Sequence, residues 1–62
     1  SPGFIETNLI EDLNDKQREE YRAMVPMKRF GQTFEVAEGV LFLASEAANY
    51  ITGTTLEISG GL

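Results

Sequence analysis

The side chains that most often carry acid–base or nucleophilic chemistry are scarce in this sequence. It has no histidine and no cysteine, so neither a Ser-His-Asp triad nor a Cys-His pair can be assembled from it. The same absence excludes a zinc site built from Cys and His. Its ten carboxylates show no calcium-loop spacing. We therefore expect no catalytic residue and no metal site within these 62 residues.

The groups best suited to hold a ligand lie in the opening segment of the chain. Pro2 fixes its own φ and Gly3 permits a positive φ, so the pair predicts a turn. Phe4 and Ile5 are apolar where a surface loop is usually polar, so we expect other parts of the protein to cover them. Thr7 follows with a hydroxyl that both donates and accepts. That hydroxyl can cap the next helix or contact a ligand, and the residues alone leave both roles open.

Composition limits the partners and the compartment. Five basic against ten acidic residues give a net charge of −5, which argues against nucleic acid or an anionic membrane as a partner, because both attract clustered Lys and Arg. No apolar run approaches the roughly 20 residues of a membrane span, and no signal-peptide pattern is present. We expect a cytoplasmic protein, and the absence of an initiator Met indicates an element upstream of Ser1.

One polar helix is expected in the first half of the chain. Asn14 is a good N-cap, and Gln17 three residues later completes a capping-box pattern. The helix is expected over residues 15–24, because Pro26 disfavours its continuation. Charged and amide side chains surround it on almost every side, so we expect it to pack weakly and to open early.

A second helix and a strand are expected further on. Thr33 is the expected cap of a helix that ends near Ala44, and the C-terminal half of this helix is apolar nearly all round, which indicates burial on more than one side. Residues 55–58 alternate and are rich in β-branched side chains, so they predict a strand ending at Gly60-Gly61. A lone strand leaves its backbone groups unpaired, so its partners must come from outside these residues.

Taken together, three stretches of the chain resemble the last quarter of the short-chain dehydrogenase/reductase family. The Pro-Gly pair alone carries no signal, but the ordered set of the three stretches covers nearly the whole sequence and is quite specific. They are Pro2-Gly3-Phe4-Ile5-Glu6-Thr7, then Pro26-Met27-Lys28-Arg29-Phe30-Gly31 leading into Glu35-Val36-Ala37, then Leu41-Phe42-Leu43-Ala44-Ser45 through Tyr50-Ile51-Thr52-Gly53 to Gly60-Gly61. The first stretch looks most like the bacterial-type 3-oxoacyl-[acyl-carrier-protein] reductases within that family.

The resemblance implies an α/β fold in which residues 1–62 are the C-terminal fragment of one doubly wound Rossmann domain. Residues 1–7 would form a turn at the cofactor site, and residues 8–25 would form short substrate-lid helices. Residues 33–45 would form one long helix, and residues 55–58 would form the final strand. In such sheets, ligands bind beyond the carboxyl ends of the strands, where the opening turn would lie.

The resemblance also implies a nicotinamide cofactor, NADP with NAD possible, held by Pro2, Gly3, Ile5 and Thr7. In the family, the residue matching Ile5 meets the nicotinamide carboxamide through its backbone, and the residue matching Thr7 offers its hydroxyl to the same amide. This hold sets which face of the ring presents its hydride. The alternative for Ile5 is a plain core side chain, and the alternative for Thr7 is a helix cap.

The implied partners are a small-molecule or carrier-bound ketone and further copies of the same chain. Homo-oligomers would form through helix 34–45 and strand 55–58, with Phe42 buried against the same helix of a second subunit. The alternative for Phe42 is a single exposed aromatic. Thr54 stands where some family members carry an acidic residue linked to an ion site, which argues against that site here.

The family's catalytic set is missing from this stretch. There is no glycine-rich phosphate loop and no Tyr-x-x-x-Lys, since Thr54 lies four residues after Tyr50. The 62 residues alone are therefore expected to be inactive, as part of an NADP(H)-dependent reductase of 3-oxoacyl-[acyl-carrier-protein]. The alternatives are a sugar or alcohol dehydrogenase of the same family, a member that has lost catalysis, and a non-catalytic assembly module.

Overall fold

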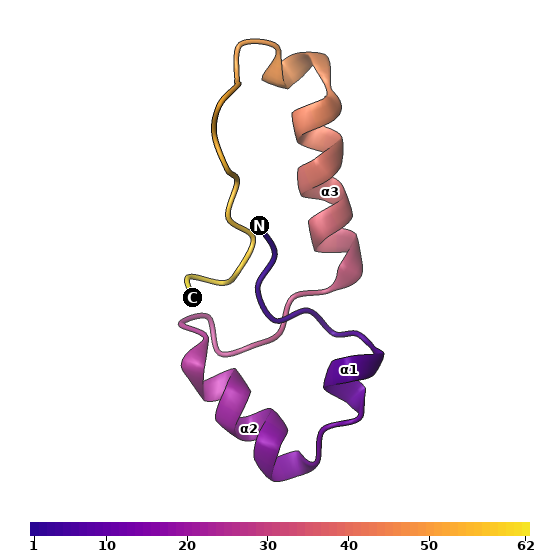
Figure 1. The fold of residues 1–62 in the computed structure, drawn as a ribbon, viewed down its shortest axis with the longest axis vertical. Helices are drawn as coiled ribbons and strands as arrows, with labels where there is room; N and C mark the ends of the chain where they lie inside the picture. The colour runs from indigo at the N-terminus through magenta and orange to yellow at the C-terminus, as the bar shows by residue number, and fades with distance from the viewer.

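The computed structural model describes residues 1–62 as an elongated chain of helices joined by extended segments (Figure 1). The helices are α1 (Asn8–Glu11), α2 (Asp15–Met24) and α3 (Thr33–Ala44), and a 3-10 turn, η1 (Glu46–Ala48), follows α3. The radius of gyration is 13.7 Å, against about 11 Å for a compact chain of this length. The chain therefore does not close into a globule by itself. None of its helices has the length and apolar character needed to cross a bilayer.

Helix α2 begins and ends where the sequence predicts. The Asn14 side-chain oxygen accepts a hydrogen bond from the Gln17 N–H at 2.8 Å, and the Gln17 side chain accepts one from the Asn14 N–H at 3.1 Å. This reciprocal capping box satisfies two backbone donors that the first turn leaves unpaired. The helix stops at Met24, two residues before Pro26. The prediction of a capped helix over residues 15–24 is confirmed.

Helix α3 begins one residue earlier than its predicted cap implies. The cap is Gln32, and Thr33 is already the first helical residue. The Glu35 carboxylate accepts a hydrogen bond from the Gln32 N–H at 2.9 Å, so the first turn closes around Gln32. The prediction that Thr33 is the cap was wrong, because the Glu35 carboxylate binds the N–H of Gln32, the residue before Thr33.

Most apolar side chains of α3 are exposed to solvent. No residue of this helix is buried, and Leu41 and Phe42 are 70% and 43% exposed. The chain buries only Val25, Phe30 and Ala48. Burial of α3 on more than one side, which its composition predicts, is not achieved by these 62 residues.

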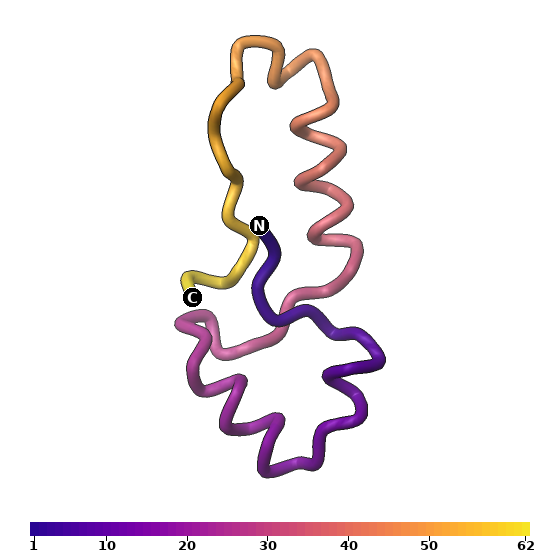
Figure 2. The backbone as a smooth tube through the Cα atoms, in the orientation of Figure 1, coloured from indigo at the N-terminus to yellow at the C-terminus, as the bar shows by residue number.

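The predicted strand over residues 55–58 is not formed as a regular strand. Residues 54–57 are extended without a ladder, and only Ile58 pairs, in an isolated parallel bridge with Pro2. The Gly3 N–H donates to the Ile58 carbonyl and the Ile58 N–H donates to the Ser1 carbonyl, both at 3.0 Å. The prediction was wrong here because a ladder needs a neighbour along its whole length, and only the first residues of the chain reach this segment. Figure 2 shows the two segments side by side.

A second bridge places the opening segment at the centre of the molecule. Ile5 and Gly31 form another isolated parallel bridge. The Gly31 N–H donates to the Phe4 carbonyl at 2.9 Å, and the Glu6 N–H donates to the Gly31 carbonyl at 2.8 Å. The first six residues therefore pair with residue 58 through one bridge and with residue 31 through the other. Helices α1 and α2 follow this segment in the chain (Figure 1).

The last residues of the chain pack against residues 25–27, which directly follow α2. The Met27 N–H donates to the Gly60 carbonyl at 3.0 Å. A Cβ on Gly60 would lie 2.8 Å from Val25 Cγ1, and one on Gly61 would lie 3.1 Å from Pro26. Both glycines have positive φ, 67° and 98°, so this approach needs residues without a side chain.

Candidate functional site

The backbone of Ile5 is the best-placed ligand group in the opening turn. In a parallel bridge, the residues on either side of the paired residue carry the hydrogen bonds, and here Phe4 and Glu6 bind Gly31. The N–H and C=O of Ile5 therefore point away from Gly31, and neither takes part in a hydrogen bond of the chain. One free donor beside one free acceptor matches the two hydrogen-bonding groups of a carboxamide.

The Ile5 side chain is packed while its backbone is free. A Cβ on Gly31 would lie 2.9 Å from Ile5 Cδ1, so the isoleucine lies directly over the glycine. The residue is half-buried. Ile5 thus serves as packing and still offers its peptide groups to a ligand.

The Thr7 hydroxyl is also uncommitted. Thr7 is the N-cap residue of α1, and its carbonyl accepts a hydrogen bond from the Glu11 N–H at 2.9 Å. Its side chain makes no capping hydrogen bond, and the residue is exposed. The capping role that Thr7 offers in sequence is filled by its backbone alone. The hydroxyl remains available two residues after the free peptide groups of Ile5.

The turn of residues 1–7 bends at Phe4 and Thr7 and not at the predicted Pro2-Gly3 pair, where Gly3 does not have a positive φ. Pro2 and Gly3 instead hold the turn in place. Pro2 pairs with Ile58. A Cβ on Gly3 would lie 2.9 Å from both Cα and Cβ of Ser59, which is closer than real side chains come to backbone. Gly3 is therefore needed for close packing against the C-terminal segment. Among the four predicted site residues, Pro2 and Gly3 fix the turn, while Ile5 and Thr7 present hydrogen-bonding groups.

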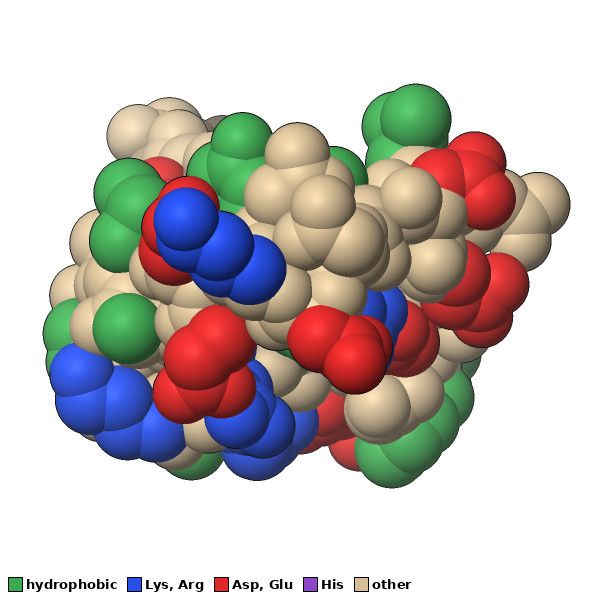
Figure 3. Space-filling model, turned by 90° about the horizontal axis from the view of Figure 1, so that it is seen from below, with side chains coloured by type: hydrophobic (Ala, Val, Ile, Leu, Met, Phe, Trp, Pro, Cys, Tyr) green, Lys and Arg blue, Asp and Glu red, His purple; other side chains and the backbone are tan.

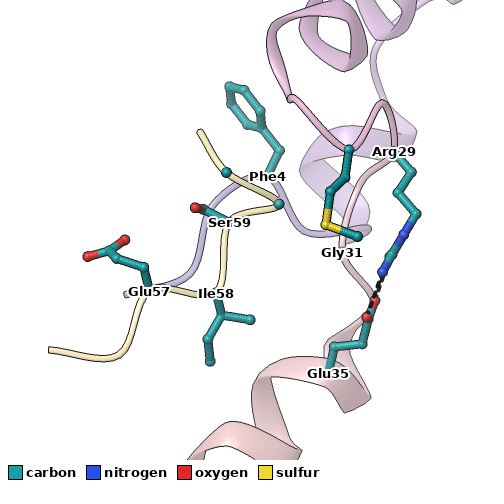
Figure 4. A pocket seen from close by; sticks show the side chains of 10 residues that line it. Phe4, Arg29, Gly31, Glu35, Glu57, Ile58 and Ser59 are labelled. Carbon is teal, nitrogen blue, oxygen red and sulfur yellow. Dashed lines mark hydrogen bonds and ion pairs between the residues drawn. The ribbon is translucent and has the colours of Figure 1, made fainter.

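An open cavity of about 430 Å³ lies between the turn and the C-terminal segment (Figure 4). None of the four predicted site residues lines it. From the turn only Phe4 contributes, and the remaining walls are Met27, Arg29, Gly31, Glu35 and residues 57–61. Its lining carries three charged side chains, and two of them form an ion pair.

That ion pair joins two of the three charged side chains of the cavity, and Glu57 is the third. Arg29 donates to both carboxylate oxygens of Glu35, at 2.8 and 2.9 Å. The Arg29 guanidinium, and after it the Gln32 N–H, lowers the pKa of Glu35 to about 2. Glu35 therefore stays ionised and paired near neutral pH, where a general acid would need a pKa close to the working pH.

Sequence reasoning missed a second ion pair, between Glu6 and Arg18. Arg18 Nη1 lies 3.0 Å from one Glu6 oxygen, and Nη2 donates to the other at 3.1 Å. Arg18 Nη1 also donates to the Ile10 carbonyl at 3.0 Å. Glu6 lies between the two residues that present ligand groups. Arg18 therefore ties α2 directly to the turn.

Aromatic side chains also contribute to the contact between α2 and the turn. The Arg18 guanidinium lies 5.3 Å from the centre of the Phe30 ring. Phe4 meets Tyr21 edge-on at 5.2 Å and Phe30 at 6.3 Å. A signal was present in the sequence, because Arg18, Tyr21 and Val25 are spaced for one face of a helix. Arg18 thus belongs to the thin apolar edge of α2 and is not simply one of its solvated charges.

The remaining charges at this end of the molecule are mixed in sign. Viewed from the end formed by α1 and α2, basic and acidic side chains alternate over the surface (Figure 3). Arg22, for example, pairs with Glu19 within α2. The surface shows no broad region of one charge in this view. The described residues also bring together no group of three or more side chains that could hold a metal ion.

The two parallel bridges fit a fragment of a Rossmann-like α/β domain, although the 62 residues form helices and no regular strand. Parallel bridges that join segments across intervening helices are characteristic of Rossmann-like α/β domains. A family model described as enoyl-(acyl carrier protein) reductase matches residues 1–62. With this match and the relatives below, the chain belongs to the short-chain dehydrogenase/reductase family. The family prediction is confirmed.

The most similar curated proteins include several 3-oxoacyl-[acyl-carrier-protein] reductases named FabG. The chain is 56% identical over all 62 residues to FabG of Buchnera aphidicola subsp. Acyrthosiphon pisum. It is 52% identical over the same length to FabG of Vibrio cholerae and 48% identical to Nodulation protein G of Rhizobium sp. strain N33. It spans 25% of the length of each of these relatives.

Proposed function

We propose that these residues belong to a reductase of 3-oxoacyl-[acyl-carrier-protein] in fatty acid synthesis that uses NADP(H). The identity to FabG proteins over the whole chain supports the substrate class. The observation that carries the proposal is the turn, where the free peptide groups of Ile5 stand two residues before the free hydroxyl of Thr7. In the proposed whole protein, the chain is the closing part of a doubly wound domain.

The residues of the turn fit a nicotinamide carboxamide. The Ile5 N–H would donate to the amide oxygen, and the Ile5 carbonyl or the Thr7 hydroxyl would accept from the amide nitrogen. Two such contacts fix the rotation of the ring about its bond to the sugar. The bound cofactor supplies the hydride, and the turn decides which ring face offers it.

The proton donor of the reaction must come from elsewhere in the whole protein. The chain has no histidine or cysteine. Tyr50 is fully exposed in the loop after α3, and Glu35 is held ionised by Arg29. We propose that the 62 residues alone do not turn over substrate.

Substrate-dependent oxidation of NADPH by the full-length protein tests the function. Activity on 3-oxoacyl thioesters should exceed activity on sugar and alcohol substrates, and absence of oxidation with every ketone class would refute the proposal. Thr7→Val should raise the dissociation constant of NADPH roughly two- to tenfold, which corresponds to one lost hydrogen bond. Thr52→Val is the matched control, because Thr52 is exposed in the loop beyond α3 and should leave binding unchanged.

We also propose that copies of the whole protein associate through α3 and residues 55–58. The exposed aromatic and aliphatic side chains of α3 support this, Phe42 among them. Phe42→Asp should shift the full-length protein toward smaller species in light scattering, since it places a charge in an apolar contact. Tyr50→Asp is the control. An unchanged mass for Phe42→Asp would remove α3 from the contact.

A further inference from the structure

Arg18 is the most connected polar side chain in the chain. It joins α2 to three other segments, through both oxygens of Glu6, the Ile10 carbonyl and the face of Phe30. The side chains of Arg18 and Glu6 are 33% and 24% exposed. The second pair on the same helix, Arg22 with Glu19, is 50% and 63% exposed, and neither side chain donates to or accepts from another element. The two pairs therefore differ in burial and in what they connect.

Glu6 is the residue through which Arg18 acts on the turn. It lies between Ile5 and Thr7, and its own N–H is bound to the Gly31 carbonyl at 2.8 Å. Its backbone is thus fixed on one side, and its carboxylate is fixed on the other by Arg18. Rotation of the chain at Glu6 would move the Ile5 carbonyl relative to the Thr7 hydroxyl. The fork of Arg18 opposes that rotation, because a bidentate pair fixes orientation as well as distance.

The same fork restrains α2. Besides Arg18, the helix approaches the turn through Tyr21, edge-on to Phe4. A lid movement that carried α2 away would break the hydrogen bond and the ion-pair contact to Glu6, and the hydrogen bond to Ile10. The carboxylate would then be left half-buried without its partner, which costs more than the loss of an exposed pair.

We propose that Arg18 is a positioning residue that couples closure of helix α2 to the geometry of the cofactor turn, with Glu6 as the group it holds. The inference rests on the proposed function, since it requires that Ile5 and Thr7 meet a nicotinamide cofactor. Coupling of this kind is reciprocal. Bound cofactor favours the closed position of α2, and the closed position of α2 strengthens cofactor binding.

Four variants of the full-length protein test the coupling. Arg18→Met keeps the apolar stem and removes the fork, Arg18→Lys keeps the charge without the fork, and Glu6→Gln removes the acceptor charge. Arg22→Met is the matched control on the same helix. We measure the dissociation constant of NADPH, the KM and kcat for a 3-oxoacyl thioester, the unfolding midpoint, and the rate of proteolysis within residues 8–25 with and without NADPH.

The variants at Arg18 and Glu6 should differ from Arg22→Met in NADPH binding and in protection from proteolysis. Arg18→Met and Glu6→Gln should each raise the NADPH dissociation constant about five- to tenfold, with the KM of the ketone following. NADPH should slow cleavage of residues 8–25 in the parent protein and much less in these variants. Arg18→Lys should recover only part of the effect, because an ammonium cannot reproduce the planar fork. Arg22→Met should match the parent in binding and in protection.

Two results would overturn the inference while the proposed function stands. One is NADPH binding and cofactor-dependent protection that are unchanged in Arg18→Met. The other is a lowered unfolding midpoint in Arg18→Met with unchanged NADPH binding, which would make Arg18 a structural residue only. A parent protein that binds neither NADPH nor NADH would refute the proposed function itself, and this inference with it.

Discussion

Gly39, in the middle of α3, offers a sharp test of how the helix packs on the C-terminal segment. A Cβ built on Gly39 would lie 2.5 Å from Ile58 Cδ1 and 3.6 Å from both Ile58 Cγ1 and Leu56 Cδ2. Only the first contact is a clash, and it involves the terminal methyl of one side chain. Gly39→Ala should therefore meet Ile58 and little else.

Two opposing effects set the size of the change. Alanine is favoured over glycine within a helix by about 1 kcal/mol. Forcing a methyl group into a filled contact costs about 1–3 kcal/mol, so Gly39→Ala alone should change stability by between about zero and 2 kcal/mol of destabilisation. Ile58→Val removes only Cδ1 and should cost about 0.5–1.5 kcal/mol.

The double variant should be more stable than the sum of its parts. With Cδ1 absent, Gly39→Ala keeps its helical advantage without the clash, so the interaction energy of the cycle should be about 1–3 kcal/mol in favour of the pair. Denaturant unfolding of the four full-length proteins at one protein concentration measures it. Ala37→Gly, in the same helix, checks the propensity value. An additive cycle, or a Gly39→Ala that stabilises by itself, would refute this packing of α3 on Ile58.

Three further outcomes follow from the same structure. Asn14→Ala should destabilise the protein by about 1 kcal/mol through loss of the capping box, while Asn14→Ser should stay near the parent in thermal unfolding. Gly3→Ala should displace the turn, because its Cβ meets the backbone of Ser59; weaker NADPH binding and a lower unfolding midpoint should both appear, and parent-like values would contradict the close approach. The pKa of Glu35 is lowered to about 2 in the folded chain, first by Arg29, so its pairing stabilises the protein above the unfolded pKa of about 4.3 and this contribution is lost as the pH falls toward 2. The midpoint difference between parent and Glu35→Gln should be constant above about pH 5 and should shrink below it, and a difference that persists at pH 2 would contradict the pairing.

Local features were predictable from the sequence and non-local ones were not. The capping box at Asn14 depends on residues three positions apart, so the start of α2 could be predicted. The strand over residues 55–58 has the right composition but finds only Pro2 as a neighbour. The start of α3 was misplaced because the Glu35 carboxylate accepts from the N–H of Gln32, one residue before the predicted cap Thr33.

The candidate site also has features that the sequence predicted and features that it did not. The cofactor role of Pro2, Gly3, Ile5 and Thr7 came from the family resemblance, and it stays a prediction. The Ile5 peptide groups are free because Gly31 makes its hydrogen bonds to Phe4 and Glu6 instead. No local sequence pattern predicts this pairing. The role of Arg18 depends on the fold bringing α2 back beside Glu6, and its spacing with Tyr21 on one face of the helix is the local signal that was missed.

The two bridges that hold the opening segment also set the order in which the chain assembles. They join residues 5 and 31, and 2 and 58, so they close loops of 26 and 56 positions. Helices of this length form within about a microsecond, while each doubling of a closed loop adds about 0.6 kcal/mol of entropy cost. The turn that presents Ile5 and Thr7 is therefore completed late, after its helices exist. A slowed refolding step should delay recovery of cofactor binding more than recovery of helix content.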